Sequence, residues 1–209
     1  MLNAIQALNQ LRDGNRRFVS NQAEDRLVST SRRAELVHGQ EPFAIILGCS
    51  DSRVPAELVF DQGFGDLFVI RVAGNIVAPS QVGSVEFAAS KFGTRLVVVM
   101  GHSQCGAVHA TLDELQGRAT SQTANLRSIV DRVRPAVETL LAGQRVVDPD
   151  ILVHEAVRAN VRASADHLRH GSALLEELIL KGGLLVVGAE YSLETGVVDF
   201  FEGSPAGRY

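Results

Sequence analysis

Two cysteines and a histidine have the types and spacing that could hold a metal ion. Cys49 follows the apolar stretch 43–48, and His102 follows the apolar stretch 95–101 with Cys105 three residues later. Thiolate sulfur and imidazole nitrogen are ligands that Zn²⁺ prefers, and three protein ligands with an open fourth position are typical of catalytic zinc. The chain has only two cysteines, too few for a disulfide framework. The pattern therefore predicts a catalytic zinc centre, with Cys49, His102 and Cys105 as the ligands.

His109 is the rival metal ligand. It lies four residues after Cys105, on the same face of a helix expected over residues 106–117. We assign His109 a neighbouring or surface role. The other histidines fall in polar helical surroundings and are expected at the surface: His38, His154, His167 and His170.

A carboxylate and a guanidinium follow Cys49 in the same loop. Beside Asp51, Arg53 would keep the carboxylate ionised and fix its orientation. The alternative is helix capping, since Asp is a common N-cap, but Pro55 suits the first helical position and places the cap later. Next to zinc, Asp51 could accept a hydrogen bond from zinc-bound water, or it could occupy the fourth position itself.

Apolar runs of strand length alternate with helical patterns along the chain. The runs predict strands at 43–48, 67–72, 95–101 and 182–192, and a short fifth at 196–201. Crossover helices between strands imply parallel pairing, and sites in such sheets form at the carboxyl ends of the strands. We predict an α/β fold: a mainly parallel central sheet of four strands plus a short fifth edge strand, flanked by helices.

An amphipathic helix is predicted at the N-terminus, where apolar residues recur every third position at Leu2, Ile5, Leu8 and Leu11. Gly14 is expected to end or bend this helix. Residues 1–40 would form an N-terminal helical arm, whose apolar stripe could pack on a partner chain or on its own domain. The length and the absence of a linker or repeat predict one domain over residues 1–209.

Composition excludes several classes of partner. The formal net charge of −4 argues against nucleic-acid binding. No stretch approaches the roughly 18–20 apolar residues of a membrane span. Polar residues interrupt the first 18 positions, unlike a signal peptide. We therefore expect a cytoplasmic protein that binds no membrane.

Three segments, "CSDSR", "RVAGN" and "GHSQCGAV", together resemble the β-class carbonic anhydrases. The resemblance implies zinc ligands at Cys49, His102 and Cys105, one ion per chain, and a catalytic pair of Asp51 and Arg53. It also implies the reversible hydration of carbon dioxide to bicarbonate and a proton, by attack of zinc-bound hydroxide.

The same resemblance implies a substrate pocket and an oligomer. Gln40, Phe68 and Phe87 match pocket-lining positions of the plant-type enzymes, with Gln40 reaching across a dimer interface. The hydrophobic character of the two phenylalanines is equally consistent with ordinary core positions. The backbone amide of Gly106 could donate to substrate or product. A homodimer, or a dimer of dimers forming a homotetramer, is expected.

A second subtype of that family has an inhibitory bicarbonate site built from Trp, Arg and Tyr. Arg71 and Tyr191 match two of these positions, but Ile46 stands at the tryptophan position. We therefore expect no such inhibition, and a site in which Asp51 does not bind zinc. Hydrolysis of carbonyl sulfide or carbon disulfide is an alternative activity. A zinc site closed by Asp51 or His109, without turnover, is an alternative of another class.

Overall fold

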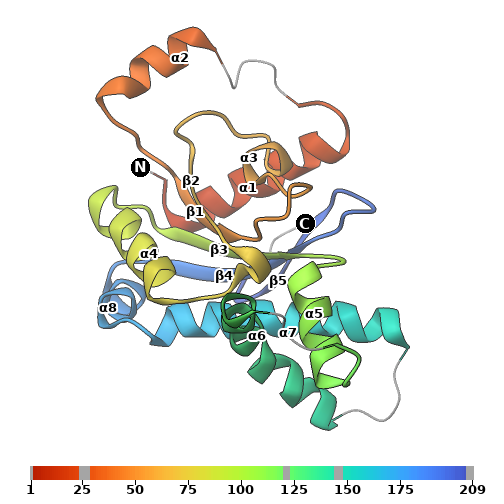
Figure 1. The fold of residues 1–209 in the computed structure, drawn as a ribbon. Coiled ribbons are helices and arrows are strands. Elements are labelled where there is room, and N and C mark those ends of the chain that lie inside the picture. The colour runs from red at the N-terminus through yellow and green to blue at the C-terminus, as the bar shows by residue number, and fades with distance from the viewer. Residues whose placement is uncertain (1, 24–28, 120–122, 144–147, 206–209) are drawn as a thin grey trace.

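The computed structural model describes residues 2–23, 29–119, 123–143 and 148–205 (Figure 1). A five-stranded sheet of order β2-β1-β3-β4-β5 forms its centre. The strands are β1 (Ala44–Gly48), β2 (Leu67–Arg71), β3 (Leu96–His102), β4 (Leu185–Tyr191) and β5 (Val198–Glu202). The first four pair in parallel, and β5 runs antiparallel to β4 at one edge. The predicted sheet is confirmed.

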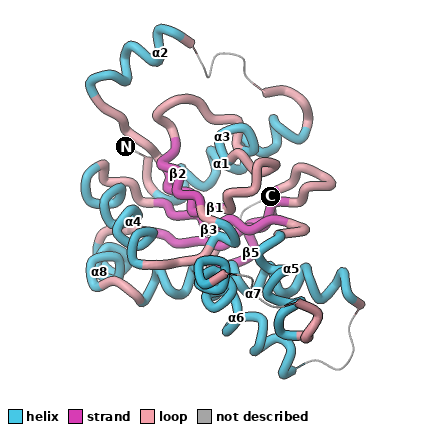
Figure 2. The backbone as a smooth tube through the Cα atoms, viewed as in Figure 1, coloured by secondary structure: helices cyan, strands magenta, loops and turns pink. Residues whose placement is uncertain are grey.

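Helices cover both faces of the sheet (Figures 1 and 2). On one face lie α1 (Ala4–Val19) and α3 (Ala56–Val59), and on the other lie α4 (Pro79–Lys91), α7 (Pro149–His170) and α8 (Ala173–Lys181). The helices α5 (Gly106–Leu115) and α6 (Ala124–Gly143) pack with α7 into a third apolar cluster, which includes both cysteines. The remaining elements are α2 (Thr30–Glu35) and the short helices η2 (Leu36–His38) and η3 (Ala73–Asn75).

Burial on both faces explains why the central strands are continuously apolar. Every residue of β1 and of β3 is buried. Val98 and Met100 face the α1 side, while Val97 and Val99 face the α4 and α7 side, because successive side chains of a strand point to opposite faces. Such double coverage is typical of parallel sheets.

The expectation that Gly14 ends or bends the first helix is wrong. Helix α1 continues through Gly14 to Val19. Gly14 is buried, and a Cβ atom there would collide with the carbonyl oxygen of Phe60. The glycine therefore allows close approach of α1 to the segment after α3, at the usual cost of glycine in a helix.

The apolar stripe of α1 packs on its own domain. Ala7, Leu8 and Leu11 are buried in the same cluster as the α1-facing side of the sheet. Asn3 caps the helix by accepting a hydrogen bond from the amide of Gln6. The stripe is thus covered within the chain at Leu8 and Leu11, whereas Ile5 is 46% exposed.

Several element boundaries also differ from the prediction by one to three residues, and two of them have a clear local cause. Pro55 is the N-cap of α3 and not its first helical residue, with ψ of 109° in the extended region. The fourth strand begins at Leu185 because Gly182 caps α8 and Gly183 adopts a φ of 71°, a conformation that suits glycine. The sequence also predicts a helical pattern from residue 122 to about 180 that is broken near Gly143 to Pro149. Part of this break, residues 144–147, lies outside the described residues.

Among the described residues, no helix combines the length and the apolar character needed to cross a bilayer.

Candidate metal centre

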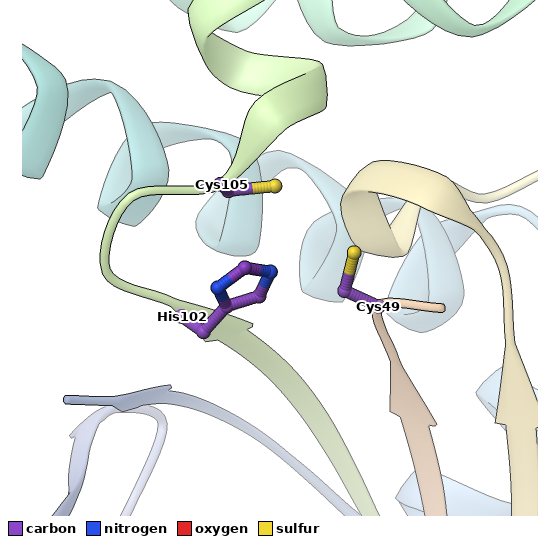
Figure 3. A group of neighbouring side chains, drawn as sticks. All are labelled: Cys49, His102 and Cys105. Carbon is purple, nitrogen blue, oxygen red and sulfur yellow. The ribbon is translucent and has the colours of Figure 1, made fainter. Parts of the chain in front are cut away.

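Neighbouring parallel strands bring the two cysteine-bearing loops together. β1 and β3 are paired, with Gly48 opposite Met100. Cys49 directly follows β1, His102 is the last residue of β3, and Cys105 is the N-cap of α5. Figure 3 shows the three side chains converging from these separate elements.

The three side chains form one compact cluster. The two sulfur atoms and an imidazole nitrogen all lie within 4.8 Å of one another. Cys49, His102 and Cys105 are 6%, 0% and 1% exposed, respectively. It is the one such group of three or more His, Cys, Asp or Glu side chains within the described ranges, and it excludes His109. His109 instead contacts Gln104, with 3.0 Å between Nε2 and Oε1.

Backbone amides favour negative charge on the sulfurs. The amide of Gly74 donates to Cys49 Sγ at 3.4 Å. Hydrogen bonding from Cys105 and from this amide outweighs burial and lowers the pKa of Cys49 to about 4. The pKa of Cys105 is raised by its hydrogen bond to the Cys49 sulfur, by burial and by the negative charge of Cys49. Two thiolates side by side repel each other, and a cation bound between the two sulfurs would offset this repulsion.

His102 presents one nitrogen to the two sulfurs. Its Nδ1 lies 2.8 Å from the carbonyl oxygen of Ser103. A carbonyl can only accept, so Nδ1 carries the proton and Nε2 has a free lone pair. Nε2 is buried and has no hydrogen-bond partner among the described residues. Burial lowers the pKa of His102, but the neighbouring Cys49 sulfur more than offsets this effect.

An orphaned nitrogen beside two sulfurs fits a zinc ion. A buried polar atom without a partner is costly, and a metal ion would satisfy it. Two sulfurs and one nitrogen are a donor set typical of zinc with a fourth position open. The backbone contact of Nδ1 is the outer hydrogen bond that metal-binding histidines usually make.

Asp51 and Arg53 form a bidentate ion pair at the open side of the cluster. Arg53 Nε donates to Asp51 Oδ1 at 2.9 Å, and Nη2 donates to Oδ2 at 2.7 Å. This pairing holds the pKa of Asp51 well below its usual range. Asp51 Oδ2 lies 3.9 Å from His102 Nε2. Asp51 does not cap α3, since its side chain accepts from the Arg53 amide at 3.0 Å instead.

Arg71 holds the loop that carries Cys49 and Asp51. Its Nε donates to the carbonyl of Cys49 at 3.0 Å, and its Nη2 donates to the carbonyl of Asp51 at 2.6 Å. The sequence singled out Arg71 only as part of a bicarbonate site. Its position at the end of β2, level with Gly48 of β1, is the signal that could have indicated this role.

Gly106, the first residue of α5, borders a cavity of about 460 Å³. The wall is mainly apolar and comes from η3, α5, α6 and the segment after α5: Ala73, Ala107, Ala110, Ala119, Leu126, Ile129 and Val130, with Asp113 and Glu114. Sequence reasoning missed these residues, because the packing of α5 against α6 and η3 is a tertiary contact that no local pattern predicts. Gly106 is exposed and has open space beside it.

The other three residues assigned to the pocket lie away from the cluster. Phe68 pairs with Ile45 of β1, four residues before Cys49 and hence roughly 13 Å back along the strand. Its ring packs 6.2 Å from that of Phe87, and both contact Phe92. Gln40 lines a separate cavity of about 650 Å³, together with Phe92. Within one chain these residues do not reach the cysteines.

Comparisons with known proteins agree with this architecture. The family model described as carbonic anhydrase matches residues 44–198. Carbonic anhydrase 2 of Mycobacterium tuberculosis is 39% identical over 194 residues, covering 93% of this chain and 91% of the relative. The carbonic anhydrase of Mycolicibacterium smegmatis is 38% identical over 198 residues, covering 94% and 93% of the two chains.

Solved structures extend the similarity to the fold. The β-carbonic anhydrase CafA of Aspergillus fumigatus superposes with a TM-score of 0.75 at 26% identity, covering 84% of this chain and 83% of that one. A tetrameric β-carbonic anhydrase of Sordaria macrospora gives a TM-score of 0.71 at 26% identity, covering 81% and 85%. The family match over most of the chain, the identities to the bacterial enzymes and the shared architecture lead to one conclusion: this chain belongs to the β-class carbonic anhydrase family.

Proposed function

We propose that this protein is a zinc-dependent carbonic anhydrase, which hydrates carbon dioxide reversibly to bicarbonate and a proton. One observation carries the proposal. The buried, unpartnered Nε2 of His102 lies beside the sulfurs of Cys49 and Cys105, with the Asp51–Arg53 pair at the open side. Family membership supports the reaction.

In this proposal, Cys49, His102 and Cys105 hold one zinc ion. Bound zinc would supply Lewis acidity that lowers the pKa of a coordinated water to around 7. The amides of Gly74 and of the first turn of α5 stabilise the negative charge on the two sulfurs. The Nδ1 contact with Ser103 keeps the histidine ring oriented for metal binding.

Asp51 and Arg53 would orient the attacking water. Asp51 stays ionised because Arg53 binds both of its oxygens. A carboxylate that is already bound on two sides can accept one further hydrogen bond, and thereby select one orientation of the water. The carbonyl contacts of Arg71 keep this loop in place. These Arg71 contacts support a site in which Asp51 faces the water and does not bind zinc.

The apolar cavity beside Gly106 would receive carbon dioxide. Its alanine, leucine, isoleucine and valine side chains suit a small apolar substrate. The exposed amide of Gly106, adjacent to Cys105, could donate to an oxygen of the substrate or of bicarbonate.

A second copy of the chain would contribute residues to the proposed active site. Apolar side chains form a patch made of the exposed Val37, Phe64 and Phe87 and the partly buried Phe68 and Phe92, beside the edge strand β2 and α4. An edge strand and an exposed aromatic patch are typical features of a protein interface. We propose that this patch mediates a homodimer, or a dimer of dimers, and that Gln40, Phe68 and Phe87 act in the partner's site.

Stopped-flow hydration of carbon dioxide across pH, with zinc content measured on the same sample, tests the proposed function. About one zinc per chain together with hydration is the expected result. Bound zinc without hydration would indicate a structural zinc site. Turnover of carbonyl sulfide or carbon disulfide in place of carbon dioxide would indicate the other activity.

A further inference from the structure

The turn after His102 is fixed to the loop between β4 and β5. The amide of Ser103 donates to the carbonyl of Tyr191 at 2.9 Å. The Ser103 hydroxyl accepts from the amide of Leu193 at 2.9 Å and donates to Glu194 Oε2 at 2.9 Å. All three hydrogen bonds join the residue after His102 to residues 191–194.

The position of Ser103 decides the orientation of the His102 ring. Its carbonyl oxygen lies 2.8 Å from Nδ1, and this contact turns Nε2 toward the sulfurs. If Ser103 shifted, Nδ1 would lose its acceptor and the other tautomer would become accessible. Any group that holds Ser103 therefore also holds the imidazole.

Glu194 is the one charged group in this network. Its Oε2 accepts from both Ser103 and Ser192, at 2.9 and 3.0 Å. Its own backbone amide, these two hydrogen bonds and the nearby charge of Arg53 lower the pKa of Glu194. The carboxylate thus remains an acceptor at neutral pH.

The loop that carries Glu194 is itself anchored. Asn15 of α1 donates to the carbonyl of Gly196 at 2.9 Å and accepts from the amide of Val198 at 2.9 Å. Asn15 is buried, so this contact is protected from water. Because the loop is held in place, it can also hold Ser103, the residue to which it is hydrogen-bonded, in place.

We infer that Glu194 is a positioning residue, which orients His102 for metal binding through its hydrogen bond to Ser103. The inference rests on the proposed metal-binding function. It assigns a role to a side chain from a distant part of the sequence that does not itself contact the cluster. For this role, the Glu194 side chain must accept a hydrogen bond from Ser103, and its negative charge is secondary.

Four variants test this role: Glu194→Ala, Glu194→Gln, Ser103→Ala and Ser192→Ala. Zinc affinity is measured by competition with a chromophoric chelator, and the His102 tautomer by ¹⁵N NMR of the metal-free protein. Glu194→Ala and Ser103→Ala should each weaken zinc binding about tenfold, at the lower end of the effect of outer partners. Both should also shift His102 away from a single Nδ1–H form.

Glu194→Gln keeps an oxygen that can accept from Ser103, so it should remain close to the parent protein in both measurements. Ser192→Ala removes the other hydroxyl from the same oxygen and should weaken zinc binding less than Ser103→Ala does. Equal effects of the two serine variants would indicate a general role in loop stability and overturn the inference. A Glu194→Gln variant as impaired as Glu194→Ala would also overturn the inference, because the charge and not the hydrogen-bond acceptor would then be the feature required.

Unchanged zinc affinity and an unchanged tautomer in Glu194→Ala would also overturn the inference. If Glu194→Ala does not fold, Ser103→Ala decides by the same two measurements. If the parent protein binds no zinc, the proposed function fails. The tautomer of metal-free His102 then still tests the positioning role.

Discussion

Arg53 binds both carboxylate oxygens of Asp51, with Nε and Nη2 donating at 2.9 and 2.7 Å. The pair lies two residues apart in the chain and faces the cysteine and histidine cluster. Because the guanidinium holds the carboxylate ionised and in one orientation, the acceptor is prepared before any water arrives.

Asp51→Asn should retain zinc and lose activity. The amide has the same shape but carries an NH₂ group and loses the bidentate ion pair with Arg53. We expect the rate of hydration to fall roughly 10- to 100-fold, with zinc content near that of the parent protein. Stopped-flow measurements with metal analysis check this. A variant with the parent rate would show that Asp51 does not orient the reacting water.

Cys49→Ser should lose metal and activity together. A serine hydroxyl is a poor zinc ligand compared with a thiolate, and one of the two sulfurs is removed. Zinc content after dialysis against a chelator, with hydration measured on the same sample, tests the expectation. Full zinc retention by this variant would remove Cys49 from the ligand set.

Gly14→Ala should destabilise the protein. The added methyl group would meet the Phe60 carbonyl oxygen, and we expect a loss of about 2–3 kcal/mol in the free energy of unfolding. Gly83→Ala in α4 is the matched control, since no atom lies within 4 Å of its added Cβ. The control should gain about 0.5–1 kcal/mol from helix propensity. Urea denaturation of both variants measures the difference.

Glu190→Gln should change stability in a pH-dependent manner. Glu190 is 6% exposed, and burial raises its pKa despite the nearby His154 and Arg158. Asp199, which also binds Arg158, raises it further. The folded protein therefore binds more protons at this site than the unfolded chain, and the contribution to stability falls as pH rises above the unfolded pKa of about 4.3.

Glutamine does not titrate, so the stability of Glu190→Gln relative to the parent protein should increase from pH 4 to pH 8. Urea denaturation across this range measures it. A relative stability that decreases over the range would mean that the ion pairs with His154 and Arg158 outweigh burial.

Phe87→Asp should dissociate the proposed oligomer. Phe87 is 53% exposed and packs with Phe68 and Phe92 in the apolar patch. A carboxylate there would be costly to bury in an interface. Leu180→Asp is the control, because Leu180 is 80% exposed on α8, outside the patch. Light scattering after gel filtration gives the mass. Dissociation of the control alone would place the interface elsewhere.

The sequence by itself determined the fold class and where the cysteines and the histidine lie in it. Buried parallel strands are recognisable from unbroken apolar runs, and 43–48 and 95–101 both became central strands. The carboxyl ends of such strands meet at one edge, which brought Cys49 near His102 and Cys105. Asp51 and Arg53 were paired because their spacing is local.

Only the tertiary structure decided the contacts between distant segments. From the sequence alone, Gly14 is expected to end the helix. Only the structure shows that the glycine is there because the Phe60 carbonyl oxygen lies beside it. The carbonyl contacts of Arg71 and the Glu194–Ser103 hydrogen bond join residues 20 to 91 positions apart. Such contacts depend on how the strands are ordered and how the loops pack. The local hydrophobic periodicity of the sequence does not predict them. Gln40, Phe68 and Phe87, which the family resemblance assigns to the substrate pocket, lie away from the cysteines of their own chain, so their role in a partner's site stays a prediction.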